Sequence, residues 1–317
     1  MNIGRKIIST VAAFLVLMST ACKSGGKVMD KNEYKEHKTA LDTGIEMAWR
    51  EYGSDDGEPV LLIHGITDGS TSWEQVAPRL AENGCHCYCI EYRGNGGTDK
   101  PDNMPEGYTA ELIAEDIENF ADKVIKEKVH VVGHSFGSAI AQQLLYDAPE
   151  KFSSSVLMDT TVDMTESALG EIFFGEDKFL DSCIEAGSMP VDFVREWTEV
   201  TNEDRDFAER IFSHTMDIPV SAWENLITGG CAFNSRAFAG DIREDVLILW
   251  GTEDVLCPAE TQDEVKQVMS GDNFTYVDIE GASHNGHWDS IANAELFAKY
   301  IEYWVKGKDI SDLPTKP

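Results

Sequence analysis

Basic residues are scarce in this chain of 317 residues, where 26 Lys and Arg stand against 57 Asp and Glu and give a formal net charge of −31. A surface this acidic repels phosphate backbones, so nucleic acid is not an expected partner. A solvated surface that keeps the protein soluble explains the acidity more simply than a dedicated cation site does.

A long apolar segment that could span a bilayer as a permanent helix is also missing near the N-terminus. The run from Ile7 to Met18 is too short for that role, but basic residues precede it and small residues follow it, which is the layout of a secretory leader. The small residues at positions 19–21, directly before Cys22, resemble the lipobox of bacterial lipoproteins, in which the new N-terminal cysteine is lipidated.

We therefore predict a signal peptide at residues 1–21 and a flexible tether at 22–35. A lipid on Cys22 would anchor the exported protein to the bacterial cell membrane. Simple cleavage without lipidation is the alternative, because Leu usually stands three residues before a lipidated cysteine and Ser19 stands there in this chain.

Cysteines at the paired spacing of zinc ligands are absent as well. Cys85, Cys87 and Cys89 alternate along one expected strand, so their side chains point to the same face and cannot easily form disulfides with one another. Zinc sites usually combine two pairs of ligands, and no second group of ligands matches these three cysteines. This favours buried thiols over zinc. We predict no metal and no cofactor, and the disulfide status of the six cysteines after Cys22 stays open.

An alternation of strand and helix patterns runs through most of the chain. Continuous apolar runs alternating with helices predict the α/β class, a mostly parallel sheet with helices on both faces. A hairpin is expected to precede the first parallel strand. Besides the strand that carries the three cysteines, the expected strands are Thr39–Leu41, Ile45–Tyr52, Val60–Ile63, Val129–Val132, Val246–Trp250 and Phe274–Ile279, and the expected helices are Ser72–Glu82, Thr109–Lys126, Ser138–Tyr146 and Ile291–Val305.

The stretch from Thr161 to Ala239 lacks comparable strand runs. Phe193 and Trp197 are four residues apart, as are Phe207 and Ile211, so each pair lies on one face of a helix. We predict a helical cap inserted into the sheet domain. The expected division is a first part of the core at 36–160, the cap at 161–240, a second part of the core at 241–308 and a tail at 309–317.

A strand-turn-helix pattern surrounds Ser135. Gly133 and Gly137 stand two residues before and two residues after the serine, where small residues let strand and helix approach without a side-chain clash. This pattern is typical of a nucleophile elbow, which presents the serine hydroxyl on a sharp turn. An ordinary glycine turn is the alternative, and the strand before and the helix after favour the elbow.

A serine hydroxyl is a weak nucleophile at neutral pH, so it needs a base and a group that orients the base. Asp254 and His284 each follow an expected strand, and the chain order serine, acid, histidine is the one that such sites use. Asp159 and Glu253 are alternative acids, for which we expect a plain surface or capping role. His287 is the alternative histidine.

Two backbone N–H groups are expected to stabilise the oxyanion of acyl transfer. One belongs to Phe136, directly after the nucleophile, and the other to Ile66, in the loop after an early strand. We expect His64 to organise this loop by hydrogen bonding rather than to transfer protons.

Six short motifs have the same order and character as those of a known superfamily: His64-Gly65-Ile66, Trp73, Tyr92-Arg93-Gly94-Asn95-Gly96, Asp99-Lys100-Pro101, Gly133-His134-Ser135-Phe136-Gly137 and Gly251-Thr252-Glu253-Asp254. Together they resemble the α/β-hydrolase superfamily over nearly the whole mature chain, in its capped esterase, lipase and C–C hydrolase branch. An acidic residue commonly stands five after the histidine in that branch, and Asp289 stands there, which favours His284 over His287. The chain departs from the family at Ser138, where many relatives have glycine, and at Asn95, where histidine is frequent.

The residues and the resemblance together predict a serine hydrolase that cleaves a carboxylic ester of a small or medium-sized substrate through an acyl-enzyme. The similar dehalogenases and epoxide hydrolases use aspartate at the elbow, so Ser135 argues against those activities. Aromatic residues of the cap could line an apolar pocket, although such residues more often form the packing core between helices. They are Phe173, Phe174, Phe193, Trp197, Phe212 and Trp223.

Three alternatives to the esterase stay open. An aminopeptidase similar to the proline iminopeptidases would receive a substrate amine on cap acids such as Glu166, Glu196 or Glu199. A C–C bond hydrolase would use the same serine, and a ligand-binding receptor would keep the fold with little turnover. A small molecule is the expected partner in each case, and the sequence does not indicate an oligomeric state.

Lipidation of Cys22 can be tested by metabolic labelling with a fatty-acid analogue. The wild type should carry the label and a Cys22→Ser variant should not, because serine offers no sulfur for the lipid. A Cys231→Ser variant is the control and should be labelled like the wild type. A wild-type protein without label would contradict the predicted anchor.

Overall fold

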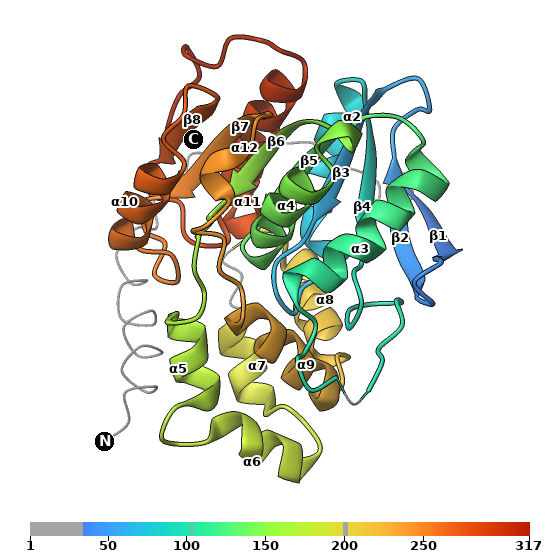
Figure 1. The fold of residues 1–317 in the computed structure, drawn as a ribbon, viewed down its shortest axis with the longest axis vertical. Coiled ribbons are helices and arrows are strands. Elements are labelled where there is room, and N and C mark those ends of the chain that lie inside the picture. Colours follow the sequence, from blue (N-terminus) through green and yellow to red (C-terminus); the bar gives the residue numbers. More distant parts are fainter. Residues whose placement is uncertain (1–33, 103, 199–201) are drawn as a thin grey trace.

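The computed structural model describes residues 34–102, 104–198 and 202–317 of the chain (Figure 1). The predicted signal peptide, the expected anchor Cys22 and nearly all of the tether lie outside these residues, as does Glu199 of the cap. Among the described helices, none is long and apolar enough to reach across a bilayer.

Eight strands form one sheet in the order β1-β2-β4-β3-β5-β6-β7-β8. β1 pairs antiparallel with β2, and β2 with β4, whereas the other neighbouring strands run parallel. This arrangement confirms the prediction of a mostly parallel sheet that begins with a hairpin. The strands are β1 (Lys35–Ala40), β2 (Glu46–Tyr52), β3 (Glu58–Ile63), β4 (Cys85–Ile90), β5 (Val129–His134), β6 (Phe152–Met158), β7 (Asp245–Gly251) and β8 (Phe274–Ile279).

Helices cover both faces of the sheet, so its central strands β3, β5 and β6 are buried along nearly all of their length. On β3, Leu61 and Ile63 face one cluster of buried side chains together with α3, α4 and α10, whereas Val60 and Leu62 face a second cluster with α2 and α12. The helical segments of this domain are η1 (Ser70–Trp73), α2 (Ala77–Glu82), α3 (Ala110–Phe120), η2 (Ala121–Ile125), α4 (Phe136–Asp147), η3 (Pro149–Lys151), η4 (Ala239–Asp241), α10 (Ala259–Val268), α11 (Gly286–Asp289) and α12 (Ile291–Val305).

The helix expected at Ser138–Tyr146 is α4, which begins at Phe136 and ends at Asp147. Two other predicted helices are not single α-helices in the structure. The helix expected at Ser72–Glu82 is the short 3₁₀ segment η1 followed by α2, which begins only at Ala77. Pro78 explains the break, because proline fits the first turn of a helix and not its interior. The helix expected to end at Lys126 leaves α-helical geometry after Phe120 and continues as the π-helical turn η2.

The three cysteines of β4 point into the second cluster, beneath α2 and α12. All three are buried, and every cysteine in the described part of the chain is a free thiol. Burial raises the pKa of the Cys85 thiol to about 11 and that of Cys87 well above its ordinary value. These observations confirm the prediction of buried thiols.

Five α-helices in the described residues between β6 and β7 form the cap, which lies below the sheet in Figure 1. Phe173 and Trp223 are fully buried and pack against Phe193 and Trp197, so most of the cap aromatics form helix-packing core, whereas the Phe174 side chain is 48% exposed. The cap helices are α5 (Ala168–Phe174), α6 (Phe179–Ala186), α7 (Val191–Trp197), α8 (Arg205–Met216) and α9 (Val220–Cys231).

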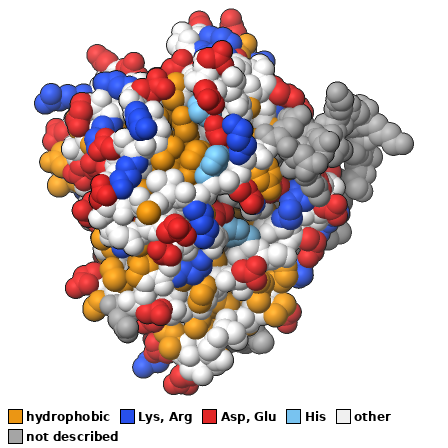
Figure 2. Space-filling model, turned by 90° about the vertical axis from the view of Figure 1, so that its right-hand side faces the viewer, with side chains coloured by type: hydrophobic (Ala, Val, Ile, Leu, Met, Phe, Trp, Pro, Cys, Tyr) orange, Lys and Arg blue, Asp and Glu red, His pale blue; other side chains and the backbone are white. Residues whose placement is uncertain are grey.

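Charged side chains cover the outer strand and the surface. β1 is an edge strand on which Lys35, Glu36 and Lys38 are exposed. On the face shown in Figure 2, acidic side chains are spread among Lys and Arg rather than gathered in one patch, as expected of a solvated surface.

The buried thiols predict a two-stage reaction with a thiol reagent. Protein that lacks residues 1–22 should show six reactive thiols when unfolded, whereas Cys85, Cys87 and Cys89 should not react in the native protein, because the thiolate is the reactive form. Cys231 is partly exposed, so a Cys231→Ser variant should lose the fastest native reaction. Fewer than six thiols in the unfolded, unreduced protein would reveal a disulfide and contradict this expectation.

Candidate active site

Ser135 stands on a sharp turn between β5 and α4. Its backbone has φ 52° and ψ −123°, and a positive φ is unusual for a residue other than glycine. Its N–H donates to the carbonyl of Met158 at 2.9 Å, which ties the turn to the end of β6. The strained turn places the serine at the wall of a cavity.

Two glycines make this turn possible. A Cβ atom on Gly137 would lie 2.3 Å from the carbonyl oxygen of Ile63, and one on Gly133 would lie 2.3 Å from the carbonyl oxygen of Gly137. No side chain fits at either position. Strand and helix therefore approach as a nucleophile elbow requires.

The structure brings Ser135, His284 and Asp254 into one hydrogen-bonded chain. His284 Nε2 lies 2.8 Å from Ser135 Oγ, and His284 Nδ1 lies 2.8 Å from Asp254 Oδ2. A carboxylate only accepts, so Nδ1–H donates to Asp254 and leaves Nε2 free to accept the serine proton. The second carboxylate oxygen of Asp254 accepts from the N–H groups of Leu256 and Cys257, at 2.8 and 2.9 Å.

Charge stabilisation between Asp254 and His284 outweighs their burial. Burial alone would lower the pKa of His284, but the charge of Asp254 and the hydrogen bond to it hold that pKa well above its ordinary value. Burial alone would raise the pKa of Asp254, but His284 and the two backbone donors lower it. The pair is therefore arranged to stabilise a protonated imidazole beside the serine.

Two further contacts position the loop that carries His284. Asp289 Oδ2 accepts from the hydroxyl of Ser283 at 2.7 Å and from its N–H at 3.2 Å. His134 Nε2 donates to the carbonyl oxygen of His284 at 2.7 Å. The role of His134 escaped the sequence analysis, and its only signal there was its place directly before Ser135.

The alternative acids occupy different environments. Asp159, at the end of β6, is fully buried, and its carboxyl accepts the N–H of Gly251 at 2.8 Å, so the predicted surface or capping role is wrong. Burial, followed by the nearby charge of Asp254, raises the pKa of Asp159 well above its ordinary value. Glu253 is exposed, as expected. The acid that bonds to His284 is Asp254 alone among the described residues.

The alternative histidine, His287, belongs to the packing core. It is fully buried, and neither ring nitrogen has a hydrogen-bond partner in the described part of the chain. Its ring lies 4.9 Å from that of Trp73 and 4.4 Å from that of His134. Burial lowers its pKa well below the ordinary value, so the ring is neutral.

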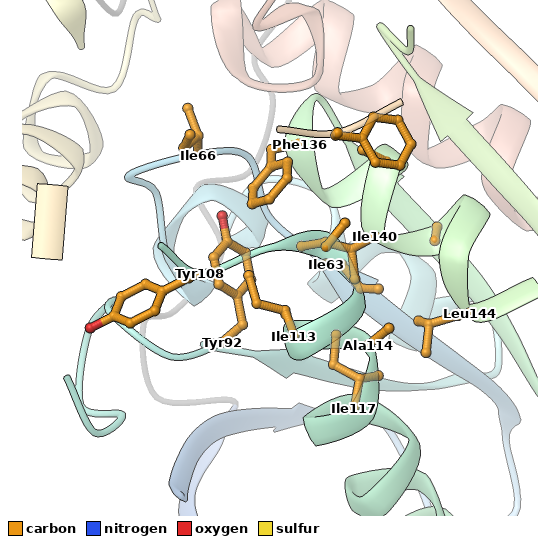
Figure 3. Close-up of a cluster of buried hydrophobic side chains, with 14 of the residues drawn as sticks. Ile63, Ile66, Tyr92, Tyr108, Ile113, Ala114, Ile117, Phe136, Ile140 and Leu144 are labelled. Carbon is orange, nitrogen blue, oxygen red and sulfur yellow. The ribbon is translucent and has the colours of Figure 1, made fainter. Parts of the chain in front are cut away.

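Ile66 and Phe136 lie on neighbouring segments at one end of the buried cluster in Figure 3. Phe136 is the first residue of α4, so its N–H has no acceptor within the helix. The N–H of Ile66 donates to no group among the described residues. Both N–H groups are thus available to a ligand beside Ser135.

His64 shapes the loop that carries Ile66. It is fully buried, and its Nδ1–H donates to the carbonyl oxygen of Gly65 at 2.8 Å. Its ring stacks on Tyr92 with 4.1 Å between ring centres. Burial lowers the pKa of His64 to about 3, so its ring is neutral and its contacts are those of an organising residue.

A cavity of about 400 Å³ opens beside Ser135 and His284. Leu169 and Trp197 of the cap give it an apolar wall. Arg236 also lines it, and its guanidinium forms ion pairs with Asp163 and Glu264. Core and cap therefore enclose the cavity together.

Acidic residues contribute to the cavity unevenly. Glu166 lines it, whereas Glu196 is exposed and is not among the lining residues. Asp68 also lines the cavity, and burial raises the pKa of its carboxyl to about 7. Sequence reasoning missed Asp68, because its place beside His134 and the cavity depends on segments that are distant in the chain.

Two groups of side chains in the described residues have the spacing of metal ligands. One consists of Asp254, Cys257 and His284, and the other of Glu51, Asp55 and His86, with the ligand atoms of each group within 4.8 Å of one another. In both groups a hydrogen bond already joins histidine and carboxylate. The three cysteines of β4 form no such group.

Comparison with known proteins identifies the fold family of the chain. A family model described as the alpha/beta hydrolase fold matches residues 58–291. A putative carbamate hydrolase, RutD, of Variovorax paradoxus is 26% identical over 266 residues, which are 81% of this chain and 95% of that protein.

One further relative and one solved structure carry the names of other hydrolases. The 2-hydroxy-6-oxo-2,4-heptadienoate hydrolase of Pseudomonas putida is 24% identical over 282 residues, which are 86% of this chain and 97% of that protein. The structure of an esterase from Exiguobacterium antarcticum superposes with a TM-score of 0.73 at 20% identity, and covers 85% of this chain and 98% of the esterase.

The raised pKa of His284 predicts how labelling of Ser135 by a fluorophosphonate depends on pH. Only the neutral imidazole accepts the serine proton, so the labelling rate should rise with pH, with its midpoint above the ordinary imidazole value of 6.5. An Asp254→Asn variant loses the charge that raises this pKa. Its midpoint should shift to lower pH, and its highest rate should fall on the order of a thousandfold or more.

Glu253→Gln is the matched control, since it removes a neighbouring acid that is exposed. It should keep the wild-type midpoint and rate. An Asp254→Asn variant with the wild-type midpoint would contradict the assignment of Asp254.

Proposed function

The chain belongs to the α/β-hydrolase fold family, and on that premise we propose that it is a serine hydrolase that cleaves a carboxylic ester of a small or medium-sized substrate through an acyl-enzyme. The observation that carries the proposal is the continuous hydrogen-bonded chain from Ser135 through His284 to Asp254, at the wall of a cavity. A ligand-binding receptor without turnover would not need these hydrogen bonds between serine, histidine and aspartate.

In the acylation step, Ser135 Oγ attacks the ester carbonyl while His284 Nε2 takes the serine proton. Asp254 stabilises the imidazolium that results. The N–H groups of Ile66 and Phe136 stabilise the oxyanion, and the protonated His284 then gives its proton to the leaving alcohol.

In the deacylation step, a water molecule takes the place of the alcohol. His284 Nε2 removes a proton from the water, whose oxygen attacks the acyl carbonyl, and the same two N–H groups stabilise the second oxyanion. Collapse of this intermediate releases the acid and returns the proton to Ser135.

The cavity supports a substrate of limited size. Its volume of about 400 Å³ lies toward the lower end of the roughly 300–1,000 Å³ typical of small-molecule sites. The apolar wall of Leu169 and Trp197 suits an acyl chain.

The charged side chains at the cavity favour a neutral ester over the anionic substrate of a C–C hydrolase. An oxo-dienoate such as the one in the name of the Pseudomonas putida relative carries a carboxylate, which needs a cation. Arg236 lines the cavity, but Asp163 and Glu264 already engage its guanidinium. A neutral ester needs no such partner.

The proposed location follows from the sequence. Export, followed by a lipid on Cys22, would hold the hydrolase at the membrane surface, with residues up to about 35 as a tether.

The proposal is tested with nitrophenyl esters of increasing acyl length and protein that lacks residues 1–22. Wild-type protein should hydrolyse the shorter esters, and Ser135→Ala should lower turnover on the order of a thousandfold or more, because it removes the nucleophile. Ser182→Ala, at an exposed serine of the cap, is the control and should keep wild-type turnover. A Ser135→Ala variant with full turnover would exclude the mechanism.

A further inference from the structure

Three side chains of the cap form hydrogen bonds to the loop that carries Ile66, residues 64–71, which we call the 64–71 loop. Trp197 Nε1–H donates to Thr67 Oγ1 at 2.9 Å. The Thr215 hydroxyl lies between the carbonyl oxygens of Ile211, at 3.1 Å, and Thr67, at 3.3 Å, and His214 Nε2 donates to the carbonyl oxygen of Asp68 at 3.2 Å. The cap thus contacts the two residues that directly follow Ile66.

Thr67 has a conformation that needs this support. Its φ is 59°, in the left-handed region that a β-branched residue seldom adopts, and its side chain is fully buried. Its hydroxyl accepts from Trp197 and donates to the carbonyl oxygen of Ile66 at 2.6 Å. The Thr67 hydroxyl therefore links Trp197 of the cap to the carbonyl group of Ile66.

The core holds the other side of the same segment. The carbonyl oxygen of Gly65 accepts from Tyr92 Oη at 2.7 Å and from His64 Nδ1 at 2.8 Å. Because the C=O and N–H of a planar trans peptide point in opposite directions, these bonds help to aim the N–H of Ile66. The core thus anchors the peptide before Ile66, and the cap anchors the one after it.

Packing leaves little freedom between the cap and the 64–71 loop. A Cβ atom on Gly69 would lie 2.0 Å from Nε2 of His214, and one on Gly230 of α9 would lie 2.9 Å from Cδ1 of Ile66. The loop and the cap helices are therefore in direct contact at Ile66 itself and at Gly69.

We propose that Trp197 and Thr67 are positioning residues, through which the cap holds the N–H of Ile66 where the oxyanion forms. This inference rests on the proposed hydrolase function. It assigns the cap a part in the rate of acyl transfer in addition to covering the cavity. Trp197 also lines the cavity. An acyl chain that packs against Trp197 would therefore stabilise the position in which the N–H of Ile66 points to the oxyanion. Acyl length would then affect kcat as well as KM.

The alternative is that these bonds only dock the cap onto the core. Variants of two other cap residues, Trp223 and Arg210, distinguish docking of the cap from positioning of the Ile66 N–H. Trp223 lies in the same aromatic cluster, 6.0 Å from Trp197, and its Nε1 has no partner among the described residues. Arg210 of α8 docks onto Glu74 with 2.6 Å between Nη2 and Oε2, and makes no hydrogen bond to the 64–71 loop in the described residues.

The test compares kcat and KM of Trp197→Phe, which keeps an aromatic ring but loses the N–H donor, with Trp223→Phe and Arg210→Gln. Loss of a whole oxyanion donor costs roughly a hundredfold to a thousandfold in kcat, and a displaced donor loses part of that, so we expect about a tenfold lower kcat for Trp197→Phe. KM should change less than kcat. Both control variants should keep kcat within about twofold, although Arg210→Gln should lower the melting temperature.

Thr67 variants supply the rescue. Thr67→Val loses the bridging hydroxyl and should resemble Trp197→Phe, whereas Thr67→Ser restores the hydroxyl and should recover kcat. The double variant Thr67→Val with Trp197→Phe should be little slower than either single variant, because both changes break one connection. Melting temperatures show whether a low rate reflects unfolding.

Labelling of Ser135 by a fluorophosphonate separates failure of this inference from failure of the proposed ester substrate, because the phosphonyl oxygen needs the same donors. If no ester is turned over, slower labelling of Trp197→Phe than of Trp223→Phe still supports the inference. Equal labelling rates and equal kcat values in these two variants would overturn it. A wild type without any labelling would overturn both proposals.

Discussion

The contact between the start of α4 and the end of β3 leaves no room for a side chain at Gly137, and the arrangement of the site follows from this contact. It places the first N–H of α4, that of Phe136, beside the loop after β3, which presents the N–H of Ile66. Ser135 lies between them on the turn from β5. The positive end of the α4 dipole points to the same place, so negative charge is favoured there before any side chain contributes.

Burial acts differently on two carboxyl groups of the site, because their hydrogen-bond partners differ: the pKa of Asp254 is lowered and that of Asp159 is raised. Asp254 and Asp159 are both buried at the ends of adjacent strands, β7 and β6. Asp254 stays ionised because His284 and two backbone N–H groups stabilise its charge, whereas Asp159 has one such donor and an unpaired second oxygen in the described residues. Asp254 therefore bonds to the imidazole, whereas the Asp159 carboxyl joins the ends of β6 and β7.

Local patterns in the sequence predicted the elbow at Ser135, the order of the acid and the histidine, and the mostly parallel sheet. These features depend on residues close together in the chain or on the strand that precedes each one. The burial of Asp159 and the contact between Trp197 and Thr67 join segments far apart in the chain, so no local pattern revealed them. The break before α2 depends on Pro78, and the spacing of apolar residues, from which the helix is predicted, does not reveal such a break.

The edge of the sheet also affects how these molecules behave at high concentration. On its outer side β1 has no strand partner among the described residues, and such an edge can template pairing with another chain. Lys35, Glu36 and Lys38 surround this edge with charges of both signs, which an approaching strand would have to desolvate. Together with the net charge of −31, they favour dispersed molecules over fibrils. Charge thus protects the β1 edge of this open sheet, whereas a closed barrel has no edge to protect.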